Sequence, residues 1–418
     1  MTRVKNIDGF LILLLILFFI PLSLFSQSSS CITCHQQMED ELFQPVKAFD
    51  QDIHQQVGLS CVDCHGGDPG EEDIDSAKDA TFKGKPERIQ IPEFCASCHS
   101  DPDYMKRFDP DIRVDQLALY WTSHHGQLLK KGGRKAAVCT DCHGVHGIQK
   151  ASHPQSWTFP WNIPKTCGGC HSDKEYMKDY SISTSQQQDY MESVHAQALL
   201  EKKDLSAPVC NDCHGNHGAV PPEVTFVAQV CRQCHLSAGE LFSASPHKQA
   251  FKEMGFSECG ACHQHHKIVK PSDEMLGYGG DGVCLQCHDE DSEAYQMADE
   301  IRQKITRMSQ RIETAGGILN RAYKQGVEVS DPRFRLKEAE SSLVKARNLT
   351  HSLSLESVEK EVSKGEQVVS EVIKEGEAAL REARVRKTGL VIALLFVFLL
   401  AVGLFLKIRH LKTRGRAS

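Results

Sequence analysis

The chain has 418 residues and a formal net charge of −7 at pH 7. This length suggests two or three domains, and a composition of 40% apolar and 25% charged residues excludes a mainly disordered chain. Without an excess of basic residues, nucleic acid is not expected as a partner. All 18 cysteines lie at or before Cys287, so a cysteine-rich part is followed by a cysteine-free part.

The first predicted element is an apolar segment over residues 10–25. Arg3 and Lys5 precede it, and small residues follow it. A basic start, an apolar run and small residues are typical of a secretory signal peptide, so we expect residues 1–28 to be removed. An uncleaved N-terminal anchor is the alternative, although Pro21 leaves the run short for a membrane span.

Every cysteine belongs to a C-x-x-C-H motif, and nine such motifs account for all 18. Histidine occupies 21 of 418 positions, so finding it after all nine pairs by chance has a probability on the order of 10⁻¹². The motif is that of covalent haem c attachment, in which two thiols bond the haem and the adjoining histidine becomes the proximal iron ligand. A zinc ribbon does not need a histidine after every pair, and a thioredoxin-like redox pair sits in a βαβ pattern that is missing here.

We therefore predict nine covalently bound haems c. They are attached through Cys31, Cys34, Cys61, Cys64, Cys95, Cys98, Cys139, Cys142, Cys167, Cys170, Cys210, Cys213, Cys231, Cys234, Cys259, Cys262, Cys284 and Cys287. Their proximal iron ligands are His35, His65, His99, His143, His171, His214, His235, His263 and His288.

The histidines outside the motifs follow an internal repeat. Three stand in an S-x-H frame 12 to 15 residues before a motif, and three follow a motif histidine by three residues, as in C-H-G-x-H-G. One unit therefore holds two motifs and two further histidines, and copies cover residues 123–171, 193–235 and 245–288. A degenerate fourth copy holds His54 with the motifs of Cys61 and Cys95, and has Asp68 at the x-x-H position.

These framed histidines are the predicted distal ligands. An x-x-H histidine is too close to its own motif to cross that haem plane, so we expect it to bind the iron of a neighbouring haem. An S-x-H histidine is expected on a short helix, such as one over residues 186–202. The first motif, at Cys31, stands outside the repeat. The predicted distal ligands are His54, His125, His146, His195, His217, His247 and His266, with His351 as an outside candidate from the cysteine-free part. Weaker alternatives are His124, His153, His265 and Met38.

Residues 31–288 offer only about 29 residues for each predicted haem, too few for a conventional apolar core. We therefore expect the porphyrins to form the core, with short helices, turns and loops around them. The predicted fold class is mainly α with much irregular coil, and a haem-packed cytochrome c domain spans residues 29–288.

Residues 289–387 are predicted to form a helical coiled-coil arm. Its first helix carries a heptad seam of Ile301, Ile305, Met308, Ile312, Ala315, Leu319 and Ala322. Gly326 is expected to end that helix, Asp331 to cap a second and Ser354 to cap a third. The arm could be a docking surface for a partner or a solvated spacer packed on the haem domain.

An apolar run of 18 residues, Gly389 to Leu406, is long enough to cross a membrane. We expect a transmembrane helix over residues 388–406 and a basic cytoplasmic tail over residues 407–418. The haems would then lie in the periplasm, where haem c is attached.

Taken together, the doubled motifs resemble those of bacterial multihaem c-type cytochromes. The resemblance covers residues 31–288, through C-T-D-C-H-G-V-H-G, C-N-D-C-H-G-N-H-G and the S-x-H frames. It implies low-potential haems with two histidine ligands and periplasmic electron transfer in anaerobic respiration. The arm and C-terminal anchor look like those of membrane-bound members. The tetrahaem quinol dehydrogenases are also similar, but they have four haems and an N-terminal anchor.

The sequence thus favours an electron-transfer protein of the inner membrane. Its expected redox partners are a quinol-linked membrane donor and a periplasmic or outer-membrane acceptor, and it could be a subunit of a respiratory complex. Iron with two protein ligands has no position left for a substrate, which favours a carrier over an enzyme. The alternative is a reductase of nitrite, hydroxylamine or a similar small substrate, with one open haem.

Overall fold

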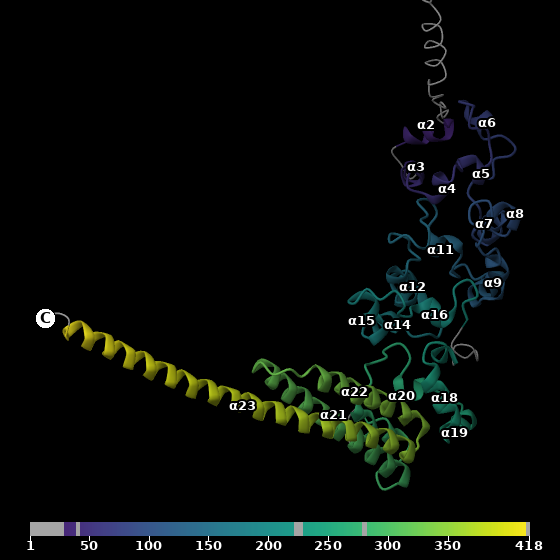
Figure 1. The fold of residues 1–418 in the computed structure, drawn as a ribbon. Helices are drawn as coiled ribbons and strands as arrows, with labels where there is room; N and C mark the ends of the chain where they lie inside the picture. The colour runs from purple at the N-terminus through teal and green to yellow at the C-terminus, as the bar shows by residue number, and fades with distance from the viewer. Residues whose placement is uncertain (1–28, 39–41, 221–228, 278–281, 415–418) are drawn as a thin grey trace, which may run out of the picture. The chain divides into compact units, whose positions relative to one another are not determined.

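The structure is a computed structural model, and it describes residues 29–38, 42–220, 229–277 and 282–414. The predicted signal peptide lies outside the described residues. Every regular element in the described part is a helix, and Figure 1 shows many short helices and a few long ones. The predicted fold class, mainly α with much irregular coil, is therefore confirmed.

The chain divides into two compact units. One consists of Met1–Gln187 and Leu199–Pro221, and the other of Gln188–Ala198 and Pro222–Ser418. The first six C-x-x-C-H motifs lie in the first unit. The last three lie in the second, together with the long helices of the arm.

The helices of the motif-bearing region are four to nine residues long, as expected for a chain that wraps cofactors. The first stretch contains α2 (Ser30–Gln36), α3 (Phe43–Phe49), α4 (Ile53–Gln56), α5 (Cys61–His65), α6 (Ile74–Ala77), α7 (Ile91–His99), α8 (Pro102–Met105), α9 (Gln116–Thr122), α10 (His124–Lys130) and α11 (Cys139–His143). It is followed by α12 (Ile163–His171), α13 (Lys174–Met177), α14 (Gln186–Met191), α15 (Val194–Leu200), α16 (Cys210–His214), α18 (Leu236–Ala244), α19 (His247–Met254) and α20 (Gly260–His263). The 3₁₀ turns are η1 (Arg88–Gln90), η2 (Pro160–Asn162), η3 (Val230–Gln233), η4 (Asp273–Leu276) and η5 (Cys284–Gln286).

One apolar cluster of the motif-bearing region consists of Tyr120, Leu129, Ala136 and Val138. The Tyr120 hydroxyl also donates a hydrogen bond of 2.9 Å to the Ala137 carbonyl. Further buried apolar side chains of the region include Phe159, Ile163 and Leu199. That the porphyrins form most of the core stays a prediction.

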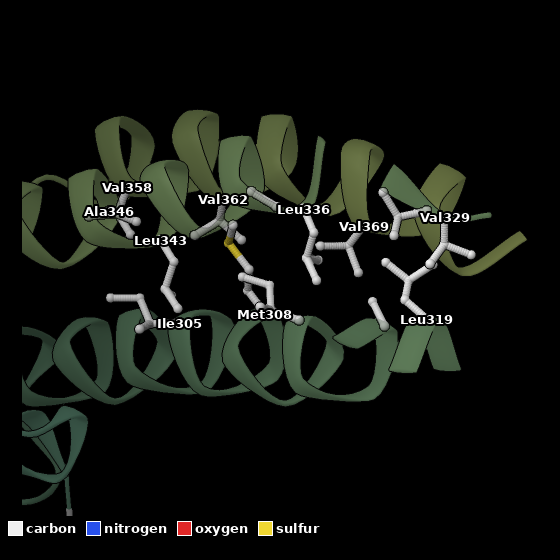
Figure 2. Close-up of a cluster of buried hydrophobic side chains, with 14 of the residues drawn as sticks. Ile305, Met308, Leu319, Val329, Leu336, Leu343, Ala346, Val358, Val362 and Val369 are labelled. Carbon is white, nitrogen blue, oxygen red and sulfur yellow. The ribbon is translucent and has the colours of Figure 1, made fainter. Parts of the chain in front are cut away.

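The arm is a bundle of three helices. They are α21 (Glu293–Lys324), α22 (Ser330–Leu349) and α23 (Leu355–Arg414), with η6 (Thr350–Ser352) between the last two. The predicted heptad seam of α21 is buried over its whole length, and it packs against apolar side chains of α22 and α23 (Figure 2). The seam prediction is therefore confirmed.

Two glycines of α23 allow it to approach α21 closely. A Cβ atom on Gly365 would lie 1.9 Å from the Met308 methyl carbon, and one on Gly376 would lie 2.6 Å from Ile318 Cγ2. Glycine therefore fits at both crossings where a larger residue would meet a packed side chain.

Some expected helix boundaries differ from the structure. The helix predicted over residues 186–202 is broken into α14 and α15 because Ser193 begins a new helix there. The second arm helix begins at Ser330, so Asp331 lies in its first turn and is not the cap. Ser354 does cap the third helix, since its hydroxyl accepts a hydrogen bond of 3.2 Å from the Ser357 amide.

The third helix does not end at the predicted membrane boundary. Helix α23 continues through the apolar run as one element of 60 residues, and its apolar side chains from Leu390 onward are exposed. By length and composition it could cross a membrane once.

Candidate haem centres

Three of the motifs fold as one isolated turn of helix, α5, α11 and α16, and their sequence C-x-D-C-H-G explains why. The aspartate side chain accepts a hydrogen bond from the backbone amide just before the motif, at 2.7 Å for Asp63, 2.7 Å for Asp141 and 2.8 Å for Asp212. The final glycine ends each turn with a positive φ of 70° to 84°. The five motif residues are therefore set in one turn by their own neighbours.

The S-x-H frame works as a helix cap. Ser123 Oγ accepts a hydrogen bond of 2.9 Å from the Gly126 amide, and Ser193 Oγ accepts one of 3.2 Å from the Ala196 amide. The cap starts α10 and α15 at a fixed residue, so the histidine two positions later is presented in the first turn. Ser245 differs, because Pro246 is at the N-cap position of α19 and no side chain caps that helix.

In the degenerate copy Asp52 takes the place of the capping serine. Its carboxylate accepts a hydrogen bond of 2.9 Å from the His54 amide and one of 2.8 Å from the His54 ring Nδ1. It is 1% exposed and also accepts a hydrogen bond of 2.9 Å from the Ile148 amide. Burial alone would raise the pKa of Asp52, but these hydrogen bonds hold it below its usual value.

The structure places seven motif histidines opposite seven histidines from outside the motifs. The distances between ring centres fall between 5.9 and 6.3 Å. The pairs are His54–His99, His65–His146, His125–His171, His143–His217, His195–His235, His247–His288 and His263–His351.

This spacing fits one iron between each pair. Metal–imidazole bonds are about 2 Å long, so two imidazoles on opposite sides of one iron have ring centres roughly 6 Å apart. Burial lowers the pKa of His125 and of His143 to about 4, which keeps both rings in the neutral form that binds a metal. A cavity of about 420 Å³ borders His143 and His146.

Several rings are also held at Nδ1, which leaves Nε2 for a metal. His65 Nδ1 donates to the Gly84 carbonyl at 2.9 Å, and His351 Nδ1 donates to the Asn348 carbonyl at 2.9 Å. Together with the Asp52 contact of His54, these are the outer hydrogen bonds that orient histidine ligands in metal sites.

The pairs follow a simple register along the chain. Each histidine of the S-x-H or D-x-H frame lies opposite the histidine of the second motif in its own repeat copy, as His125 lies opposite His171. An x-x-H histidine reaches back two motifs, as His146 meets His65 and His217 meets His143. His351 lies opposite His263, in the first motif of the third repeat copy (residues 245–288). The frame histidine and the x-x-H histidine of that copy belong by this register to other motifs.

The remaining candidates are not in these pairs. His124 and His153 are exposed, and His265 lies against Gly260 within the motif of Cys259. His214 and His266 belong to different compact units of the fold, and both stay predicted ligands. Met38 is half-buried in the chain after α2.

Neighbouring motifs meet through their cysteines. The thiol of Cys95 is in hydrogen-bond contact with that of Cys139, Cys167 with Cys210, and Cys231 with Cys259. The second cysteines of other neighbours are close enough for their charges to interact, as for Cys64 with Cys98 and Cys142 with Cys170. Cys61 is similarly near Cys31, and Cys262 near Cys284. In each unit, the motifs therefore lie in space in the order of the sequence.

The sequence analysis missed the outer groups that hold the rings. Asp52 was detectable, because aspartate caps helices as well as serine does, so D-I-H is a variant of S-x-H. The Gly84 and Asn348 carbonyls carry no such signal, because any residue has a backbone carbonyl. Only the folded chain shows which carbonyl lies beside which ring.

Comparison with known families agrees with this geometry. Residues 53–172 match the cytochrome c3 family, and residues 247–293 match the doubled CXXCH motif. No curated protein and no solved structure matches the chain. The first match begins beside His54 and contains four motifs, and the second begins at His247 and contains two. The chain thus contains a cytochrome c3-like domain and carries the features of a multihaem c-type cytochrome that binds haem c covalently.

Proposed function

We propose that this protein is a membrane-anchored electron carrier with nine haems c in the periplasm. It would relay electrons between a quinol-linked donor of the inner membrane and a periplasmic or outer-membrane acceptor in anaerobic respiration. When bound, haem c supplies an iron that exchanges single electrons. The observation that carries the proposal is the set of seven opposed histidine pairs.

The residues themselves favour a carrier. Two imidazoles on one iron leave no position for a substrate and favour a low potential. Cysteines of successive motifs lie near one another within each compact unit, which supports haems attached in sequence as neighbours. A line of neighbouring sites, most of them closed by histidine, suits transfer along the protein.

The proposed anchor implies a distance between the His263–His351 site and the membrane. His351 immediately precedes α23, and the apolar run of that helix begins at Gly389. The intervening 34 residues of helix are about 50 Å long at 1.5 Å per residue. We infer that the donor is a protein that itself extends from the membrane, because a quinol within the bilayer would be too far from the His263–His351 site.

A pyridine haemochrome assay and electron paramagnetic resonance of the full chain test the proposal. We expect about nine haems per chain and mainly low-spin signals from the oxidised protein. Six or fewer haems would contradict the count. High-spin signals from most of the haems would contradict histidine ligation on both sides and favour the reductase alternative.

A further inference from the structure

The first motif differs from all the others in its histidine partner. All 21 histidines lie in the described part of the chain. His35 belongs to none of the seven opposed histidine pairs. His124 and His153 are exposed and lie in the same compact unit as His35. Among the described residues, neither ring contacts the His35 ring. His35 therefore has no histidine opposite it among the described residues.

The register of the repeat explains this difference. The motif of Cys31 is followed by the degenerate fourth repeat copy, so it stands in the register of a second motif. In the other copies the histidine partner of a second motif precedes that motif, so no later histidine occupies that position relative to Cys31. By the same register His266 belongs with the motif two places before its own, which is not that of Cys31.

By this register, Met38 is not expected to be the sixth ligand of the haem at His35. It follows His35 by three residues, the offset at which His146 and His217 pair with other motifs and not with their own. The helix α2 that carries the motif has no buried residue, and Cys34 is exposed. The described residues therefore do not enclose the motif of Cys31.

We propose that the haem held by Cys31, Cys34 and His35 has no histidine as its sixth ligand and binds small π-accepting molecules of the carbon monoxide or nitric oxide class. This inference rests on the proposed function, because it requires haem at that motif. The Ser30 amide donates to the Pro69 carbonyl at 2.9 Å, and Cys31 lies near Cys61. The ligand-binding haem would therefore adjoin the haem of the Cys61 motif.

The test is a titration of the reduced, fully loaded full chain with carbon monoxide. We expect one carbon monoxide bound per chain. The double variant Cys31→Ala/Cys34→Ala should contain eight haems and bind none. The matched variant Cys284→Ala/Cys287→Ala removes the haem of the last motif in the sequence, and it should contain eight haems and still bind one. His54→Ala should bind two, since it opens the iron of His99 as well.

Two results would overturn the inference while leaving the carrier intact. One is no binding by a chain that contains nine haems; a methionine-to-iron charge-transfer band that disappears in Met38→Ala would have the same meaning. The other is binding that persists in Cys31→Ala/Cys34→Ala. The haemochrome count separates these results from failure of the proposed function, since a carrier without haem at Cys31 would have eight haems before any substitution.

Discussion

His351 lies opposite His263 with 6.1 Å between the ring centres, although the two residues belong to different parts of the sequence. Its ring is oriented by the Asn348 carbonyl, and the same turn of chain is fixed by a hydrogen bond of 2.7 Å from Asn348 to Ser237. Arg347 adds a bidentate ion pair to Asp273, with distances of 2.8 and 2.7 Å. The arm is therefore joined to the last haem-binding segment.

Substitution of His351 by alanine tests this junction. The cysteines of the Cys259 motif would still hold their haem, so the haem count should not change. One iron should lose an axial ligand, and the carbon monoxide bound per chain should rise by one relative to the unchanged protein. The potential of that haem should also rise, because a histidine ligand favours the oxidised iron.

His124→Ala is the matched control for this substitution. His124 is an exposed histidine of the motif-bearing region, and no opposed ring pair includes it. Its replacement should change neither the stoichiometry of carbon monoxide nor the spin state. An unchanged stoichiometry in His351→Ala would mean that the arm does not provide a ligand.

Local spacing in the sequence was enough to predict the buried seam of the arm. The seam residues repeat at heptad spacing, so their burial follows from helix geometry alone. The same holds for the proximal histidines, which are part of the motif. The approach of α23 to α21 at Gly365 could not be predicted, because it depends on where two helices cross.

The histidine pairs were predictable in kind but not in partner. The repeat predicted that His146 binds the iron of another haem, but its contact with His65 of the second preceding motif is set by the path of the chain around that motif. The break between α14 and α15 at Ser193 could not be predicted from the sequence for a different reason. Helical residues stand on both sides of it, and the cap is stronger than their tendency to continue one helix.

A chain that ends after Lys387 tests the anchor. This change removes the exposed apolar part of α23 and leaves the bundle core, which extends to Val372, intact. We expect the shortened protein to appear in the soluble periplasmic fraction with an unchanged haem count. A chain that ends after Arg414 should remain in the membrane fraction.

Retention of the shortened chain in the membrane would contradict a single C-terminal anchor. In that case the N-terminal segment would be an uncleaved anchor, and the mass of the purified protein would include residues 1–28. A cleaved signal peptide would instead give a protein that begins near residue 29.

Ser123→Ala tests how the frame presents a ligand. The change removes the acceptor for the Gly126 amide and should destabilise the first turn of α10 by about 1 kcal/mol. Hydrogen exchange of the amides in α10 should become faster. Ser123→Asp should restore slow exchange, because Asp52 caps α4 in the same way. Equal exchange in the alanine variant and the unchanged chain would mean that the cap does not hold α10.

Gly365→Ala tests the close crossing of α23 over α21. The new methyl group would lie 1.9 Å from the Met308 methyl carbon and 3.1 Å from Ser342 Cβ, so side chains or helices must move. Overpacking of this kind costs about 1–3 kcal/mol, more than the gain of up to about 1 kcal/mol from helix propensity. Hydrogen exchange of α21 should therefore show a lower opening free energy. Gly317→Ala is the control: nothing lies within 4 Å of its Cβ, so propensity alone should act and the opening free energy should rise. A rise in both variants would mean that the helices do not cross closely at Gly365.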